Sequence, residues 1–298
     1  MFKIVISIIL LFFTQQIFSA DLKLQSVNVI IPFPSGGGAD LTFRHFESYL
    51  LQKKNIKLVP LYKPGANGII GVTELYNAKT DGQTVFIGTV GTIAEFKNKH
   101  PDKDIILVSM IRSSIFSLVT NQKTKISSLE DFEHRLKSNT RILFGIGAPT
   151  QKNYAAILLD NLGYKSNVDF VNYKGSSPLL QDLIGGHIDI AYVPFTLVKS
   201  SIDNNKLILL ATDEEKVGNY NAPSLTNRFK NWEKTDGFVF ALPPHTPSNL
   251  VEYWGKILED YLNDKNVLAE FNKDYISSYP YSSQLAQKLI QITLNKLK

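Results

Sequence analysis

The chain has 298 residues, of which 44% are apolar and 20% are charged, with a formal net charge of +5 and no cysteine. A chain of this length can bury a core for one large or two ordinary domains. The basic residues form no long block of like charge, so the composition excludes a strong nucleic-acid interface. The lack of cysteine excludes disulfides, thiol catalysis and a lipid-modified N-terminal cysteine.

The N-terminus has the pattern of an exported protein. Lys3 precedes the apolar run "IVISIILLFF", which is followed by "TQQIFSA" ending at Ala20. We expect residues 1–20 to be a secretory signal peptide and the mature protein to be periplasmic. A permanent membrane anchor is the less favoured alternative, because the apolar run is shorter than the roughly twenty residues that span a bilayer.

After this segment, short apolar runs alternate with helical patterns, as in parallel sheets covered by helices. We therefore expect an α/β fold. The predicted strands cover residues 27–33, 56–62, 83–89, 104–111, 141–146, 188–194 and 206–211. Helical stripes at three- and four-residue spacing, such as Phe43, Phe46 and Leu50, are predicted to face the core.

Two changes of pattern indicate where the chain passes between domains. In "SSLEDFE", Ser128 precedes Asp131 by three residues, a capping-box variant that predicts a helix start just after the polar segment 121–125. In "KTDGFVFALPPHTP" a polar turn gives way to an apolar strand and a proline-rich loop. The expected division is a first domain of residues 21–123 and 238–298 and a second of residues 124–237.

The stretch "PFPSGGGAD" is the first candidate ligand loop. A predicted strand runs through three glycines into a helix, whose first backbone NH groups have no partner within the helix. Such a turn binds anions, and Gly36, Gly37 and Gly38 leave its backbone open to a ligand. The spacing fits neither "GxxxxGK[ST]" nor "GxGxxG", which disfavours nucleotide binding. Asp40 is predicted to be the helix N-cap, with direct ligand contact as the alternative.

The same construction occurs twice in the second half of the chain. In "RILFGIGAPTQKNYAAILL" a strand leads to Thr150, which can cap the next helix and still face a ligand. In "DFVNYKGSSPLLQDLIGG", Gly175 and two serines precede a proline suited to a first helical turn. For Ser176 and Ser177, capping and ligand contact are equally favoured. Two domains that face each other with such loops, at the carboxyl ends of strands, would enclose a small anion as a clamshell binding protein does.

Several segments, taken in order, resemble the signatures of one family. They are "VIIPFPSGGGAD", "LYKPGANGIIGVTELYNAKTDGQTVFIGTVGT", "VNYKGSSPLLQDLIGGHIDIAYVP" and "NAPSLT" with "FVFALPPHTP". On these segments nearly all of the mature chain resembles the substrate-binding proteins of tripartite tricarboxylate transporters, the Bug family of periplasmic receptors. The resemblance implies a two-domain type II periplasmic-binding (Venus flytrap) fold with two hinge strands. It implies a monomer, without cofactor or metal, that closes on a small organic carboxylate.

The resemblance also assigns the site. The carboxylate is expected on the glycine loop, with loops of the second domain opposite. The implied ligand-binding residues are Phe33, Ser35, Gly36, Gly37, Gly38, Asp40, Thr89, Gly91, Thr92, Ala148, Pro149, Thr150, Tyr173, Gly175 and Ser176.

Three positions depart from the family pattern. Tyr62 stands where asparagine is frequent, Gln151 stands where histidine is common, and Tyr192 lies where an acid is often close by. Because of these departures, the sequence does not determine the chemistry of the solute at the end far from its bound carboxylate. A polar or an aromatic carboxylate is compatible with them. Lys174 is either solvated or a bridge to the ligand charge.

Two alternatives concern function. The receptor either delivers its solute to the integral membrane permease subunits of a tripartite tricarboxylate-type transporter or presents it to a sensor kinase, and the sequence does not decide between them. A secreted hydrolase is the rival from another class. The five histidines form no "HExxH" pair and the chain has no "GxSxG" elbow, so we expect a binding protein and not an enzyme.

Overall fold

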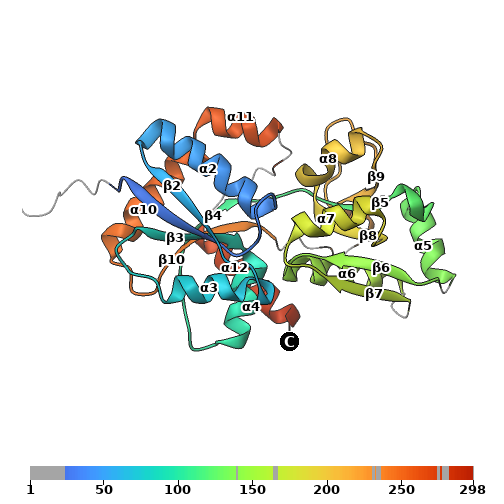
Figure 1. Ribbon diagram of the computed structural model, residues 1–298, viewed down its shortest axis with the longest axis horizontal. Coiled ribbons are helices and arrows are strands. Elements are labelled where there is room, and N and C mark those ends of the chain that lie inside the picture. Colours follow the sequence, from blue (N-terminus) through green and yellow to red (C-terminus); the bar gives the residue numbers. More distant parts are fainter. Residues whose placement is uncertain are drawn as a thin grey trace, which may run out of the picture.

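The computed structural model describes residues 24–138, 140–163, 167–229, 232, 236–273, 276 and 282–297, and the predicted signal peptide lies outside this part. The described residues form two five-stranded sheets with interleaved helices, arranged side by side as two lobes (Figure 1). The predicted α/β fold is confirmed. In this part of the chain no helix combines the length and apolar character needed to cross a membrane.

The first lobe is built on the sheet β2-β1-β3-β10-β4. Its strands are β1 (Ser26–Ile31), β2 (Lys57–Tyr62), β3 (Thr84–Thr89), β4 (Ile106–Arg112) and β10 (Phe238–Leu242). β1 pairs in parallel with β2 and β3, whereas β10 is antiparallel to β3 and β4. One face is covered by α2 (Gly38–Lys54), α10 (Ser248–Leu262) and α11 (Lys265–Lys273). The other is covered by α3 (Ile69–Tyr76), which follows the 3-10 turn η2 (Ala66–Gly68), and by α4 (Val90–Lys99) and α12 (Ser283–Leu297).

The second lobe repeats this plan on the sheet β7-β6-β8-β5-β9. Its strands are β5 (Phe116–Asn121), β6 (Ile142–Ile146), β7 (Val168–Asn172), β8 (Ile190–Pro194) and β9 (Leu207–Thr212). β6 is parallel to β7 and β8, and β5 is antiparallel to β8 and β9. Its helices are α5 (Leu129–Lys137), α6 (Pro149–Leu162), α7 (Ser176–Gly185), α8 (Phe195–Asp203) and α9 (Leu225–Arg228), with the 3-10 turn η3 (Gln122–Thr124) before α5.

Each sheet has a separate apolar cluster on each face. Phe43, Phe46 and Leu50 of α2 pack into one of these clusters with Trp254 of α10, as their spacing predicts. Strands buried on both faces are apolar at nearly every position, which is why the central strands could be predicted from sequence. The Ser128 cap is also confirmed, because its side chain accepts a hydrogen bond from the Asp131 amide at the start of α5.

The chain passes between the lobes in two places. The first passage is short, from the end of β4 at Arg112 to the start of β5 at Phe116. The second lies between Thr212 of β9 and Phe238 of β10, a span that contains the predicted boundary at 237/238. The predicted boundary at 123/124 would place β5 in the first domain, whereas β5 pairs within the second sheet. As domain limits, the two boundaries remain a prediction.

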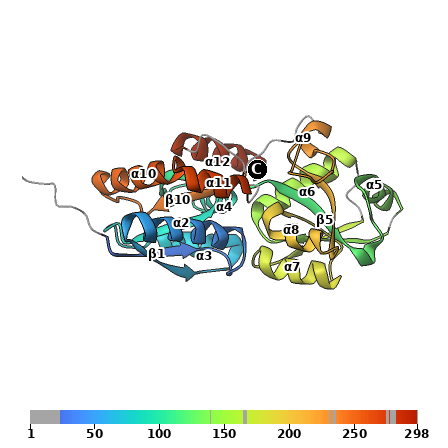
Figure 2. The same cartoon turned by 90° about the horizontal axis from the view of Figure 1, so that it is seen from above.

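The sequence did not predict β5, because its alternating polar residues do not have the pattern of a central strand. Ser117, Thr120 and Asn121 are all buried, and each donates a side-chain hydrogen bond to a backbone carbonyl between Ile188 and Val193. These bonds offset the cost of burying polar groups. The helix α12 carries the end of the chain to the boundary between the lobes, close to α9 (Figure 2).

Candidate binding site

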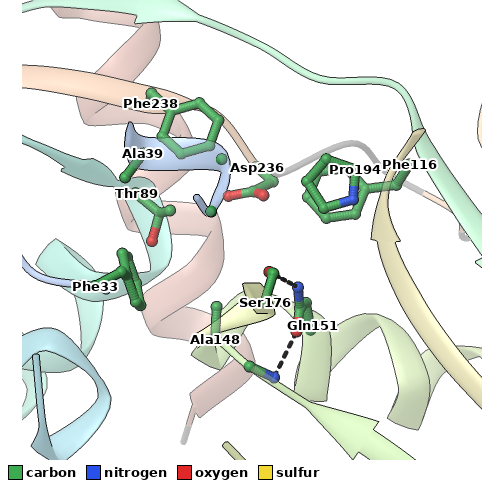
Figure 3. Close-up of a pocket in the computed structure, with 13 residues that line it drawn as sticks. Phe33, Ala39, Thr89, Phe116, Ala148, Gln151, Ser176, Pro194, Asp236 and Phe238 are labelled. Atoms are coloured by element: carbon green, nitrogen blue, oxygen red, sulfur yellow. Dashed lines mark hydrogen bonds between the residues drawn. The ribbon is translucent and has the colours of Figure 1, made fainter. Parts of the chain in front are cut away.

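A small cavity lies between the two lobes, at the carboxyl ends of the parallel strands (Figure 3). It is lined by Phe33, Gly37, Gly38, Ala39, Thr89, Phe116, Gly147, Ala148, Gln151, Ser176, Pro194, Asp236 and Phe238. Its volume is about 30 Å³, room for about two water molecules. Entry of an organic solute therefore requires the lobes to separate.

The glycine loop forms the first-lobe side of the cavity. β1 ends at Ile31, and α2 begins at Gly38 with Gly37 as its N-cap, without a side-chain capping bond. Gly36 has a φ of 80°, a conformation that glycine adopts without strain. Since Gly37 and Gly38 line the cavity, the partnerless NH groups of the first turn of α2 lie at its wall.

Asp40 is not the N-cap, and this prediction is wrong. It lies in the first turn of α2 and is buried, with Oδ2 accepting hydrogen bonds from the Gly36 amide at 2.8 Å and Arg44 Nε at 3.0 Å. Its Oδ1 accepts a bond from the Tyr62 hydroxyl at 2.6 Å. The carboxylate therefore folds the glycine loop back onto its own helix, and Asp40 does not line the cavity.

The pKa of Asp40 follows from these contacts. Burial alone would raise it, but the hydrogen bonds from Tyr62, the Gly36 amide and Arg44 outweigh burial and hold the pKa below its usual value. Asp40 thus stabilises the fold at pH values above the pKa it has when unfolded, near 4, and this contribution is lost as the pH falls through the lower folded pKa. Tyr62, one of the three departures from the family pattern, therefore has a structural role. Its hydroxyl donates a hydrogen bond to the Asp40 carboxylate, which shapes the glycine loop.

Replacing Tyr62 with phenylalanine is expected to lower the free energy of unfolding by about 2 kcal/mol, because a hydrogen bond to a charged acceptor is lost. Urea unfolding at pH 7 measures the change. The control is Tyr76→Phe on α3, which lies away from the glycine loop and should be nearly neutral. The loss should shrink only as the pH falls through the lowered folded pKa of Asp40, where the carboxylate takes up a proton. A loss that stays constant down to the lowest pH at which the protein is folded would contradict this role.

Thr89 completes the first-lobe side. It caps α4, with Oγ1 accepting from the Thr92 amide at 3.1 Å and lying 2.9 Å from the Thr92 hydroxyl. Thr89 lines the cavity, whereas Gly91 and Thr92, which lie in the first turn of α4, do not.

On the second-lobe side, the predicted cap at Thr150 is wrong. α6 begins at Pro149 with Ala148 as N-cap and no side-chain capping bond, and Thr150 is fully buried. The side chain of Gln151 makes the hydrogen bonds at this helix start instead. Its Oε1 accepts from the Gly147 amide at 2.6 Å, and its Nε2 donates to Ser176 Oγ at 3.1 Å. Gln151 thus ties the start of α6 to the start of α7 (Figure 3).

Neither serine of the third loop caps α7, because its N-cap is Gly175 and no side-chain capping bond is present. Ser176 lines the cavity, but Ser177 faces a separate surface groove with Tyr173 and Lys174. The Tyr173 hydroxyl donates to Asp182 Oδ2 at 2.7 Å, within the second lobe. Burial and this bond raise the pKa of Tyr173 to about 12.

The predicted site residues therefore separate into two groups. The structure brings Phe33, Gly37, Gly38, Thr89, Ala148 and Ser176 to one cavity. It places Ser35, Gly36, Asp40, Gly91, Thr92, Pro149, Thr150, Tyr173 and Gly175 outside the lining of that cavity.

Sequence reasoning missed several lining residues. Phe116 follows the first passage between the lobes, and Asp236 and Phe238 lie at the end of the second. Pro194 ends β8, in the segment whose departure from the family pattern was noticed at Tyr192. Tyr192 itself is buried in the second-lobe core, stacked on Phe116 at 5.1 Å between ring centroids. A strand end beside an interlobe passage was the one signal available for these positions.

The two lobes come into close contact around the cavity. A methyl group placed at Gly91 of α4 would overlap the Thr150 hydroxyl and lie 3.1 Å from the Thr150 amide nitrogen of α6. A methyl group at Gly175 would lie 2.8 Å from Pro34 Cδ. Both pairs join different lobes, so these glycines permit backbones to meet where larger residues would hold the lobes apart.

Two α/β lobes joined by strand connections, with a cavity between the N-termini of their helices, define a two-domain solute-binding protein. The chain belongs to the family described as tripartite tricarboxylate transporter family receptor (TctC), whose model matches residues 50–298. That match begins after the glycine loop.

Curated relatives have similar sequences, and solved structures share the fold. The protein BugT of Bordetella pertussis is 23% identical over 256 residues, covering 82% of this chain and 78% of BugT. The structure titled R. palustris Rpa4515 with adipate has a TM-score of 0.82 at 20% identity, covering 91% of this chain and 94% of that chain. MatC (Rpa3494) from Rhodopseudomonas palustris with bound malate has a TM-score of 0.81 at 18% identity, covering 92% and 99%. The predicted two-domain type II periplasmic-binding fold is confirmed.

Proposed function

We propose that this protein is a periplasmic receptor that captures a small carboxylate-bearing solute between its lobes for delivery to the permease subunits of a tripartite tricarboxylate-type transporter. The carrying observation is the convergence of four helix N-termini on one cavity: Gly37 and Gly38 of α2, Thr89 of α4, Ala148 of α6 and Ser176 of α7. Helix N-termini supply NH donors and partial positive charge to an anion.

The electrostatics of the cavity fit this role. The described residues that line it include no lysine, arginine or histidine, so a bound carboxylate would be met by backbone NH groups and by the hydroxyls of Thr89 and Ser176. Phe33, Phe116 and Phe238 supply apolar surface for the carbon skeleton of the solute. Two similar structures are named with adipate and malate, which are both small carboxylates.

A thermal-unfolding panel tests the proposal. Residues 21–298 would be heated with mono-, di- and tricarboxylates, acidic amino acids and aromatic acids, with sugars and cations as controls. A solute at about a hundred times its dissociation constant should stabilise the protein by roughly 2.7 kcal/mol, a shift of a few degrees for a chain of this size. A shift restricted to carboxylates supports the receptor, and shifts with sugars alone would contradict it.

Delivery to a permease is tested separately, by co-purification from envelope extracts after cross-linking in the presence of the solute. Recovery of permease subunits supports transport. Recovery of a sensor-kinase ectodomain alone would assign the receptor to signalling instead.

A further inference from the structure

Among the described residues that line the cavity, one carries an ionisable side chain, and its negative charge has the wrong sign for a carboxylate. Asp236 lies just before β10, is only 8% exposed, and lines the cavity. Its carboxyl group points toward the middle of the cavity, between Thr89 and Pro194 (Figure 3). Among the described residues no hydrogen bond reaches Asp236 Oδ1. A buried acceptor without a partner is costly, so its presence in a binding cavity indicates a role with the ligand.

Among the described residues, the groups around Asp236 do not compensate a negative charge on it. The Gly237 amide and the Thr150 hydroxyl face the carboxyl group, although Thr150 Oγ1 makes no hydrogen bond of good geometry to the described residues. Arg112 of β4 pairs in register with Phe238, but its Nη2 lies 3.5 Å from Thr196 Oγ1 of α8. No ion pair in the described part of the chain includes Asp236.

Two other ionisable groups lie on this side of the cavity, Tyr192 and Asp213, and neither compensates the charge of Asp236. Tyr192 of β8 is fully buried and has a raised pKa, caused first by burial and then by the charge of Asp213. It is therefore neutral, and its hydroxyl makes no hydrogen bond to the described residues. Asp213 is itself an acid and would oppose any further negative charge. Burial raises the pKa of Asp236 to about 7, against smaller lowering effects of the Gly237 amide and Thr150.

We propose that the solute is an amino acid or another amine-bearing carboxylate, whose protonated amine is received by Asp236 while its carboxylate lies on the glycine loop. The proposal rests on the proposed receptor function and narrows its solute class. A zwitterion satisfies both ends of the cavity, because helix N-termini attract the carboxylate and the unpaired Asp236 oxygen accepts from the ammonium group. A dicarboxylate would place its second carboxylate where the ammonium group would lie, and the charge of Asp236 would repel it.

The rings around the cavity fit the same solute. Phe116 and Phe238 lie on either side of Asp236 in Figure 3, and an ammonium group near an aromatic face gains a cation–π contribution. The faces of these rings, which carry partial negative charge, would not attract a second carboxylate. The proposal therefore distinguishes solutes by one group, the amine.

The test compares acids that differ only in that amine. Calorimetric titration at pH 7.5 would use L-leucine against 4-methylpentanoate, L-phenylalanine against 3-phenylpropanoate, and L-glutamate against glutarate. For the best-bound pair, we expect the wild type to favour the amino acid by at least about tenfold, the effect of one charge-assisted hydrogen bond. Asp236→Asn should remove that preference while binding of the amine-free acid is kept or strengthened. Asp102→Asn, a change at an exposed acid, should leave both affinities unchanged.

A pH series gives a second readout. Because Asp236 must lose its proton to receive an ammonium group, the wild-type affinity for the amino acid should fall by about tenfold per pH unit below 7, and Asp236→Asn should not show this fall. If carboxylate affinity instead falls above pH 7, a protonated Asp236 donates to a carboxylate, which overturns the proposal.

The remaining outcomes separate the proposals. Equal or tighter binding of amine-free acids by the wild type overturns the amine-bearing class but keeps the carboxylate receptor. An equal loss of both acids in Asp236→Asn assigns Asp236 a purely structural role and also overturns it. Binding of none of these acids, nor of any carboxylate in the thermal panel, overturns the receptor function itself.

Discussion

Replacing Gly37 with valine is expected to abolish solute binding, with a loss of about a hundredfold or more in affinity, while the fold is kept. Gly37 lines a cavity of about 30 Å³, and valine would fill this space and cover the NH groups at the start of α2. Blocking one charge-assisted hydrogen bond and overpacking the cavity each cost roughly 1–3 kcal/mol, which together give this loss.

The fold should tolerate this change. The φ of Gly37 is −89°, in the extended region open to valine, and a Cβ there would meet only Pro34 O, at 3.7 Å. Calorimetry with the best solute of the thermal panel and urea unfolding measure the two effects. Gly255→Val on α10, where the nearest atom to a Cβ is 4.0 Å away, is the control. Wild-type affinity in Gly37→Val would remove the glycine loop from the site.

Replacing Gly91 with alanine is expected to hold the lobes apart and to weaken binding by at least about tenfold. The added methyl group would overlap Thr150, so the closed arrangement becomes accessible only at the cost of moving α4 from α6. A receptor that must close to bind loses apparent affinity in proportion to its closed population. Within α4 itself alanine is the better helix former, so the stability of the first lobe should not fall.

Small-angle X-ray scattering and calorimetry together test this prediction. Gly91→Ala should increase the radius of gyration with saturating solute, and Gly91→Ala/Thr150→Ala should partly restore closure because the overlapping hydroxyl is removed. Gly255→Ala is the matched control, remote from the interlobe contact. Unchanged scattering and affinity in Gly91→Ala would show that α4 and α6 do not need to meet for binding.

The sequence by itself determined the layers of the fold. Buried parallel strands must be apolar on both faces, so β1, β3, β6 and β8 could be recognised from their composition, and Ser128 identified a helix start through one local hydrogen bond. β5 was not recognised, because its Ser117, Thr120 and Asn121 are made compatible with burial only by carbonyls of another strand.

The site divides in the same way. The glycine loop was predictable, because a strand, three glycines and a helix start are contiguous in the chain. Asp40 was not, since the donor that distinguishes it from a cap is Tyr62 on a neighbouring strand. The cavity also takes residues from segments far apart in sequence, namely Phe116, Pro194 and Asp236. They come together only because β10 pairs within the first-lobe sheet and β5 pairs within the second-lobe sheet. Local patterns determined which segments could bind an anion, and the crossing of the chain between lobes decided which side chains would face it.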